Sequence, residues 1–289
     1  MGSRADFHCH STASDDVLSP TALVRLAHEQ GVRIMALTDH DSTEGVAEAR
    51  AAAAPFGDFS LIPGVEMGTD IPGAEVHVLG YFLSPENAEL SEMLRELRES
   101  RLLRGQRMVE RLQEMGLDVT WEQVQRIAGG ASVGRPHVAQ ALHEKGHVAT
   151  VKEAFDKYIA RNGPAYVERE KMTPAEAVQT IIRFSGVPCL AHPRDVTKNA
   201  AELDRIVGEL KDAGLVAMEV YYKAYEPEAV EQLRQIAVRH DLIPLGGSDY
   251  HGLYGDDEPF PGQMHSPLPD KSIEAILNLG RARIDGRAG

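Results

Sequence analysis

Short apolar runs alternate with amphipathic segments along the first 85 residues. Ser19 followed by Pro20 predicts the start of a helix, because serine caps a helix N-terminus and proline fits its first turn. This helix should end near Gly31, and a second, alanine-rich helix is expected over residues 42–54. Apolar runs predict four strands, around residues 5–10, 33–38, 61–66 and 75–82. This order of elements indicates a largely parallel sheet that is covered by helices.

Between residues 85 and 160 the pattern changes to consecutive helices without strands. A long amphipathic helix rich in arginine is expected over residues 89–115, and a glycine-rich loop over residues 129–134. Shorter helices are expected at residues 121–127, 135–142 and 151–159. We therefore expect a barrel domain made of residues 1–85 and 165–289, with residues 86–164 as an all-helical insert that covers the active site.

The alternation of strands and helices resumes at about Tyr166. Further strands are expected at residues 187–191, 216–221 and 243–248. Helices are expected after Thr173-Pro174, at residues 200–212 and 227–240, and from Ser272. A count of about seven strands favours a closed or nearly closed α/β barrel over an open sheet. On such sheets the catalytic groups gather at the carboxyl ends of the strands.

Composition narrows the possible partners. The chain has 289 residues, of which 43% are hydrophobic and 26% charged, and it contains no apolar run long enough to span a membrane. Its net charge of −14 argues against binding to extended duplex nucleic acid or to anionic membranes. Cys9 and Cys189 show no pairing framework, which suits a reducing cytoplasm. An anionic substrate would therefore need local positive charge, from metal ions or clustered arginines.

Metal-ligating side chains stand at or near the ends of the predicted strands. His8 and His10 can reach one ion, because residues i and i+2 of a strand point to the same face. The full set has nine imidazoles and carboxylates and no thiolate: His8, His10, Asp15, His40, Glu66, His77, His192, Asp249 and His251. Such ligands suit Mn, Fe or Zn, and nine exceed what one ion can use. Two or three ions with a bridging carboxylate such as Glu66 are expected, a type of site that stabilises the attacking and leaving oxygens of phosphoryl transfer. Asp39 and Asp41 are expected to orient their neighbours.

Several of these residues lie in short motifs that occur in a fixed order. The motifs are His8-x-His10, Thr38-Asp39-His40, Pro63-Gly64-Val65-Glu66, His77, Ala191-His192-Pro193 and Ser248-Asp249-x-His251. From Ala5 to about Gly252 the chain resembles the PHP superfamily (polymerase and histidinol phosphatase). The resemblance implies a distorted seven-stranded β/α barrel.

The same resemblance implies three divalent ions, with manganese favoured and iron or zinc as alternatives. One ion would take His8, His10, Glu66 and Asp249; a second would take Glu66, His77 and His192; the third would take Asp15, His40 and His251. The position of Asp15 is often histidine in other branches, which separates this chain from the histidinol-phosphatase-like members.

The start of the helix at Gly134-Arg135-Pro136-His137 resembles the stand-alone phosphoesterase branch. Members of that branch hydrolyse nucleoside 3',5'-bisphosphates, and some trim short RNA from its 5' end. Arg135 and His137 at a helix N-terminus predict a phosphate site. We expect Arg104 and Arg107 to bind a second phosphate and Arg194 to contact the scissile phosphate.

The predicted function is thus hydrolysis of the 3'-phosphate of a nucleoside 3',5'-bisphosphate, with 5'-phosphorylated short oligoribonucleotides as a further substrate. A metal-bridging hydroxide would attack phosphorus beside Glu66, and His192, His251 or a metal-bound water would protonate the leaving oxygen. Two alternatives stay open: a phosphatase of a non-nucleotide metabolite such as histidinol phosphate, and a non-catalytic metal-binding PHP module. The sequence predicts no oligomeric state.

Overall fold

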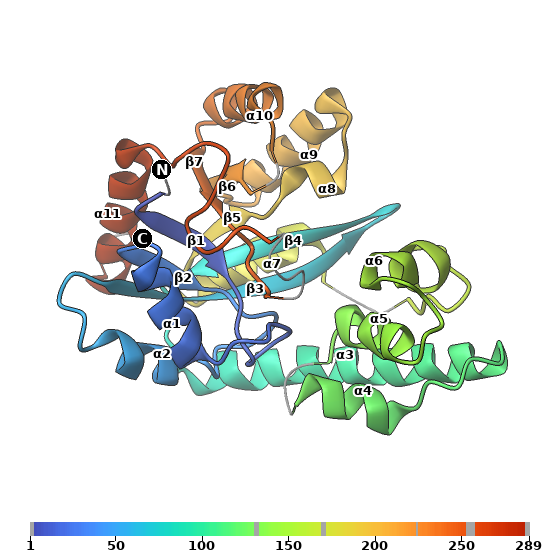
Figure 1. Cartoon of the computed structure of the whole chain (residues 1–289). Coiled ribbons are helices and arrows are strands. Elements are labelled where there is room, and N and C mark those ends of the chain that lie inside the picture. Colours follow the sequence, from blue (N-terminus) through green and yellow to red (C-terminus); the bar gives the residue numbers. More distant parts are fainter. Residues whose placement is uncertain (1–2, 130–132, 169–171, 224, 253–257, 287–289) are drawn as a thin grey trace.

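Seven strands form one sheet in the computed structural model of the chain, and they follow one another in sequence order (Figure 1). The structure describes residues 3–129, 133–168, 172–223, 225–252 and 258–286. The strands are β1 (Ala5–Cys9), β2 (Ile34–Leu37), β3 (Ser60–Ile71), β4 (Ala74–Tyr81), β5 (Val187–Leu190), β6 (Ala217–Tyr222) and β7 (Ile243–Gly247). Neighbouring strands are parallel except at β3–β4 and β4–β5, where they are antiparallel.

The sheet curls until its first and last strands meet. The backbone amide of Asp249 donates to the carbonyl of His8 over 2.8 Å, and that of His10 donates to the carbonyl of Tyr250 over 3.2 Å. These bonds lie just beyond the end of β7 and bring the carboxyl ends of β1 and β7 together. The predicted seven-stranded, nearly closed barrel is confirmed.

The hairpin of β3 and β4 departs from the expected pattern. The sequence predicts Glu66 and His77 at or near the carboxyl ends of strands, but both lie well inside strands, and β3 runs five residues beyond Glu66. Because β4 is antiparallel to β3, it carries His77 back along the hairpin, opposite Gly68 and diagonal to Glu66. His77 thus reaches the site through a cross-strand neighbour. The rule that strand ends carry the site does not account for its position.

The helices of the barrel cover the outside of this sheet. Ser19 caps the first helix through a hydrogen bond from the amide of Ala22, as its sequence predicts. The helices are α1 (Pro20–Glu29), α2 (Val46–Ala53), α7 (Pro174–Arg183), α8 (Pro193–Val196), α9 (Ala200–Asp212), α10 (Pro227–Arg239) and α11 (Asp270–Ile284). One prediction was wrong in detail: α2 begins four residues late. The short helix α8 directly follows His192. Among the described helices none is both long and apolar enough to cross a membrane.

A helical region stands between β4 and α7. It comprises α3 (Ala88–Glu114), α4 (Trp121–Ala128), α5 (Arg135–Glu144), α6 (Val151–Ala154) and the π-helical turn η1 (Phe155–Ile159). These helices enclose their own apolar cluster, separate from the barrel core. Of the predicted loop at 129–134, residues 130–132 lie outside the described part of the chain.

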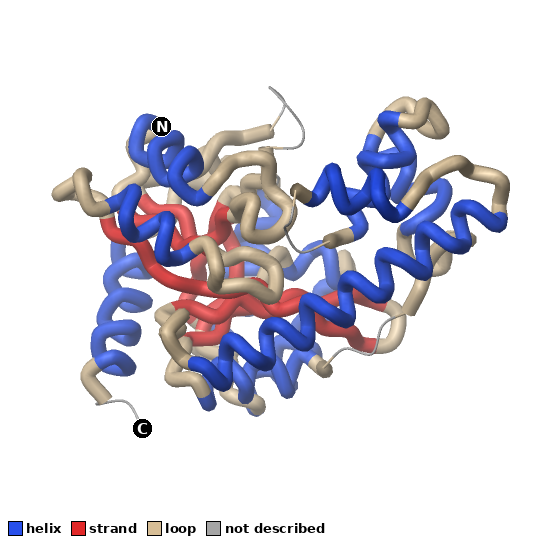
Figure 2. The backbone as a smooth tube through the Cα atoms, turned by 90° about the horizontal axis from the view of Figure 1, so that it is seen from below, coloured by secondary structure: helices blue, strands red, loops and turns tan. Residues whose placement is uncertain are grey.

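The long helix α3 connects the two regions (Figure 2). Leu90 and Leu94 near its start belong to the barrel core, whereas Met108 and Leu112 near its end belong to the second cluster. A domain boundary at residue 86 therefore stays a prediction, because the change from one core to the other falls within α3. The helix carries residues of its middle turns past the open end of the barrel.

Gly247 at the end of β7 lets two strands approach closely. A Cβ at this position would lie 2.4 Å from the Cβ of His8. We expect Gly247→Ala to destabilise the fold by about 1–3 kcal/mol, because overpacking displaces neighbouring atoms. Thermal unfolding measures this effect. Gly57→Ala is the matched control, since no atom lies within 4 Å of the added Cβ; equal melting temperatures for the two variants would contradict the close approach.

Candidate metal centre and phosphate pocket

Nine polar side chains meet at one end of the barrel. His8 and His10 come from β1 and the residue after it, His40 follows β2, Glu66 and His77 lie on the β3–β4 hairpin, and His192 follows β5. Asp249 and His251 follow β7, while Asp15 lies in the loop after β1. The structure brings together all nine residues that the sequence singled out as metal ligands.

Four of these residues have the spacing of ligands around one ion. The Nε2 atoms of His8 and His10 lie 3.1 Å apart, and each is 3.2–3.4 Å from Glu66 Oε2 and from Asp249 Oδ1. Zinc-type bonds of about 2.0–2.1 Å in a tetrahedron place donor atoms roughly 3.3 Å apart, so the observed separations match. The donor chemistry and the spacing both fit a divalent ion held by His8, His10, Glu66 and Asp249.

Glu66 is the centre of the whole cluster. Its Oε1 lies 2.8 Å from His77 Nδ1 and 3.1 Å from His192 Nε2, while its Oε2 lies 3.0 Å from His40 Nδ1. With His8 and His10, five imidazoles contact this one carboxylate, which is only 1% exposed. The two oxygens face different groups of histidines, an arrangement that suits a bridging ligand.

A further group surrounds Asp15. His251 Nε2 lies 3.4 Å from Asp15 Oδ1, and His40 Nε2 lies 3.7 Å from Asp15 Oδ2. His10 joins this group through Nδ1, at 3.7 Å from Asp15 Oδ1. Within the described residues, Asp15 Oδ1 is buried and accepts no hydrogen bond, which leaves it available to a cation. His10 and His40 each belong to two groups, so the predicted assignment of particular ligands to three ions stays a prediction.

The pKa shifts within the cluster of nine side chains show that its carboxylates attract positive charge. Burial by itself would raise the pKa of Glu66, but the surrounding imidazoles outweigh it and hold the pKa well below its usual value. Burial would lower the pKa of His251, yet Asp15 and Asp249 raise it to about 10. The pKa of His40 is lowered to about 3, chiefly by burial, so its lone pair is free for a ligand role. The ionised carboxylates draw protons onto their neighbours, and divalent cations would satisfy the same demand.

Hydrogen bonds from outside the cluster orient its members. Glu219, fully buried on β6, accepts from the backbone amide of His192 over 2.7 Å, and its Oε1 lies 3.2 Å from His8 Nδ1. Asp39 accepts from the amide and hydroxyl of Ser11 and from the hydroxyl of Ser14, which fixes the loop that carries Asp15. This is the orienting role that the sequence predicts for Asp39.

The backbone at three of the site positions adopts left-handed conformations. Asp41, His192 and Asp249 have φ of 49°, 22° and 47°. Such angles are strained for residues other than glycine, and they persist where the surroundings impose them. At Asp249 the Tyr222 hydroxyl donates to Oδ2 over 2.7 Å, and Lys223 Nζ donates to the backbone carbonyl over 2.6 Å. These bonds stabilise the conformation that directs Oδ1 at His8 and His10.

We expect Glu219→Gln to weaken metal binding by about 10- to 100-fold, the range for partners that orient metal ligands. The amide keeps the size of the side chain but loses the charge that supports His8 and His192. Competition with a chelator measures metal affinity directly. Glu226→Gln, at an exposed acid at the start of α10, serves as control. Unchanged metal affinity in both variants would show that Glu219 does not support metal binding.

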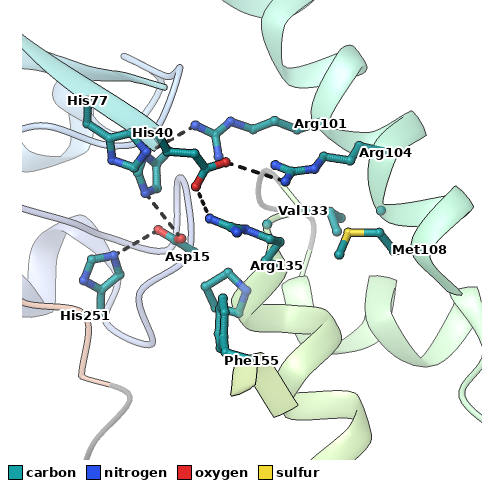
Figure 3. Close-up of a pocket in the computed structure, with 14 residues that line it drawn as sticks. Asp15, His40, His77, Arg101, Arg104, Met108, Val133, Arg135, Phe155 and His251 are labelled. Atoms are coloured by element: carbon teal, nitrogen blue, oxygen red, sulfur yellow. Dashed lines mark hydrogen bonds and ion pairs between the residues drawn. The ribbon is translucent and has the colours of Figure 1, made fainter. Parts of the chain in front are cut away.

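A cavity of about 180 Å³ opens beside Asp15, His40, His77 and His251. Arginines from two helices line its opposite wall: Arg101 and Arg104 from α3, and Arg135 from the first turn of α5 (Figure 3). Arg101 was not singled out by its sequence, although it lies one helical turn before Arg104. Its Nε donates to Asp41 Oδ2 over 2.5 Å, and its Nη2 lies 3.5 Å from His40 Nδ1. Gly68 leaves the space for this guanidinium, since a Cβ there would lie 2.8 Å from Nη2.

Three of the five predicted phosphate-binding residues lie elsewhere. Arg107 is exposed and does not line the cavity. The Arg194 guanidinium contacts the Lys198 carbonyl and Gln232 Oε1, so it is directed away from the histidines. His137 is buried, and its Nδ1 accepts from the amide of Gly134 over 2.9 Å, which caps α5. The structure therefore brings only Arg104 and Arg135 of this set to the cavity beside the histidine cluster.

Comparison with known proteins agrees with this geometry. The model of the PHP domain family matches residues 6–168. The chain belongs to the PHP family. It is 36% identical over 247 residues to the 5'-3' exoribonuclease Rnm of Salmonella typhimurium, a match that covers 85% of this chain and 84% of that protein. This PHP protein is also 31% identical to a 3',5'-nucleoside bisphosphate phosphatase of Chromobacterium violaceum, over 85% and 86% of the two chains.

Solved structures resemble this PHP protein over nearly its whole length. A protein of Bifidobacterium adolescentis designated a metal-dependent phosphoesterase superposes with a TM-score of 0.84, at 31% identity and over 96% of each chain. An amidohydrolase of Chromobacterium violaceum, solved with bound sulfate and no metal, gives a TM-score of 0.86 at 29% identity, over 94% of this chain and 96% of that one. The match includes the helical region as well as the barrel.

Proposed function

We propose that this PHP protein cleaves the bond between the 3'-oxygen and phosphorus of nucleotides that also carry a 5'-phosphate. Nucleoside 3',5'-bisphosphates and 5'-phosphorylated short oligoribonucleotides both meet this description, because the same 3'-oxygen leaves in each case. The broader class is a metal-dependent hydrolase of phosphoesters: the two relatives are named as an exoribonuclease and a bisphosphate phosphatase, and the Bifidobacterium adolescentis neighbour as a metal-dependent phosphoesterase.

One observation carries the proposal: a single cavity has a region suited to divalent ions on one side and a region suited to anions on the other. On one side lie the ligand groups around Asp15 and Glu66, and on the other lie Arg104 and Arg135. Divalent ions bound by the first region would supply Lewis-acid stabilisation of phosphoryl charge and a nucleophile from water at neutral pH. Arg104 and Arg135 would hold the 5'-phosphate, because guanidinium groups bind phosphate oxygens in planar, charge-assisted pairs. The sulfate in the Chromobacterium violaceum neighbour supports a site for tetrahedral anions.

Residues of the chain orient the reacting phosphate by their fixed positions. Arg101, held by Asp41 beside His40, is directed into the cavity from the helix side and would contact the equatorial oxygens of the scissile phosphate. His251 Nδ1 contacts the carbonyl of Asp249, and its Nε2 lies 3.4 Å from Asp15 Oδ1. His192 Nε2 lies 3.1 Å from Glu66 Oε1, whereas its Nδ1, 3.5 Å from Asp195 Oδ2, makes no hydrogen bond within the described residues. Both histidines would serve as ligands, and His192, His251 or a water would donate the proton to the leaving oxygen.

A substrate panel tests the proposal. With Mn²⁺, Fe²⁺ or Zn²⁺ supplied in turn, kcat/KM is measured for adenosine 3',5'-bisphosphate, for an oligoribonucleotide with and without its 5'-phosphate, and for histidinol phosphate. We expect the bisphosphate and the 5'-phosphorylated oligonucleotide to be preferred. Equal or faster turnover of histidinol phosphate would instead favour a metabolite phosphatase. The native metal, the number of ions and a cytoplasmic location stay predictions.

A further inference from the structure

Glu75 places a carboxylate on the wall of the cavity between the two arginines. It lies on β4 two residues before His77, so both side chains point to the same face of the strand. Its side chain is 17% exposed and lines the cavity together with His40, Arg104 and Arg135. A negative charge here stands in the region that we propose for the 5'-phosphate of the substrate.

This carboxylate joins two guanidinium groups from different helices. Glu75 Oε2 pairs with Arg135 Nη2, and its Oε1 lies 3.6 Å from Arg104 Nη2. Arg104 is 8% exposed, and within the described residues its Nη2 donates no hydrogen bond. Burial, together with the neighbouring Arg135, lowers the pKa of Arg104, whereas the Glu75 carboxylate acts in the opposite direction. Glu75 thus occupies the position that suits an incoming phosphate.

Arg101 provides an internal comparison. Its partner Asp41 is fully buried and bonds to Nε, and Asp41 does not line the cavity. The face of Arg101 that carries Nη2 remains directed toward His40 and the cavity. A ligand can therefore contact Arg101 without displacing Asp41, whereas it must displace or share Glu75 to pair with Arg104 and Arg135.

We propose that Glu75 is a built-in competitor for the remote phosphate, which makes tight binding depend on both phosphoryl groups. The proposal rests on the proposed function. A substrate anchored at the metal centre through its 3'-phosphoryl group can displace Glu75 with its 5'-phosphate. The product, a nucleoside 5'-monophosphate, has lost the first anchor, so Glu75 returns to the arginines and the product leaves. Glu75 is in this sense a specificity and release residue: it acts through Arg104 and Arg135.

Glu75→Gln is the test, carried out on the metal-loaded enzyme with adenosine 5'-monophosphate as the probe. Titration calorimetry should show about tenfold tighter binding of the monophosphate, since one negative charge near its phosphate is removed. Steady-state inhibition by the same compound should strengthen in parallel, and both KM and kcat for the bisphosphate should fall because release slows. The glutamine preserves the size of the side chain, and thermal unfolding checks that the variant is folded.

Glu89→Gln is the matched control, because Glu89 is an exposed acid that pairs with Arg183 away from the cavity. It changes the net charge equally and should leave the affinity for adenosine 5'-monophosphate unchanged. Unchanged or weaker binding in Glu75→Gln would overturn the proposal and make Glu75 a support for the arginines. Failure of the proposed function would appear separately, as absence of bisphosphate turnover by the wild-type enzyme.

Discussion

Glu66→Gln is expected to abolish phosphoesterase activity and to deplete the protein of metal. Five imidazole rings contact the Glu66 carboxylate, and its two oxygens serve different groups of histidines. Glutamine keeps the shape but can offer only one neutral oxygen, so the cluster loses its central anionic ligand. We expect the loss of metal affinity to exceed the roughly 100-fold that marks the upper range for residues outside the coordination shell. Elemental analysis after dialysis, together with the turnover rate, measures both effects.

Glu86→Gln controls for the change in charge, because Glu86 is an exposed acid paired with Arg50 on the outer surface. It should retain its full metal content and rate. A Glu66→Gln protein that keeps wild-type metal content would show that the carboxylate is not a shared ligand. The cluster around Asp249 and Asp15 would then have to bind the ions without a bridge.

Arg135→Ala should produce the second largest effect, confined to substrates that carry a 5'-phosphate. Removing a charged hydrogen-bond partner costs about 1.5–3 kcal/mol, which corresponds to a rise in KM of about 10- to 150-fold for adenosine 3',5'-bisphosphate. Adenosine 3'-monophosphate lacks the group that Arg135 would hold, so its kinetic constants should stay unchanged. Metal content should also be unaffected, since the ion pair of Arg135 is with Glu75, which is not one of the nine clustered side chains.

Arg107→Ala is the matched control for this experiment. Arg107 lies on α3 only three residues after Arg104, but its side chain is exposed and does not line the cavity. Its removal should leave the kinetic constants for both substrates unchanged. If Arg135→Ala raised KM equally for the two substrates, or for neither, the cavity wall made by α3 and α5 would have no role in recognising the 5'-phosphate.

The sequence predicted that the nine side chains would meet, because strand ends of a barrel converge on one region. His8, His40, His192 and Asp249 follow or end strands, so their meeting follows from the parallel order alone. His77 does join the cluster, but not because it ends a strand: the antiparallel strand β4 brings it back beside Glu66. No local pattern shows which way a strand runs, and the direction emerges only when the hairpin pairs.

The residues that we propose to bind phosphate were harder to predict because their positions depend on how the helices pack. Arg101, Arg104 and Arg107 share one helix, and helical spacing alone does not tell which face meets the barrel. Packing of α3 across the open end buries Arg104, directs Arg101 to the cavity and leaves Arg107 exposed. Glu75 and Glu219 are isolated acids in strands, with no motif around them. Every partner named here lies at least 27 residues away along the chain, so no local pattern indicates the contacts.

The identity of the product made from adenosine 3',5'-bisphosphate tests the central claim most directly. After reaction with the metal-loaded enzyme, phosphorus NMR or chromatography distinguishes the two possible monophosphates. We predict adenosine 5'-monophosphate and inorganic phosphate, because the arginines would retain the 5'-phosphate while the 3'-phosphate is removed. Adenosine 3'-monophosphate as the product, or no turnover with any of the three metals, would contradict the account.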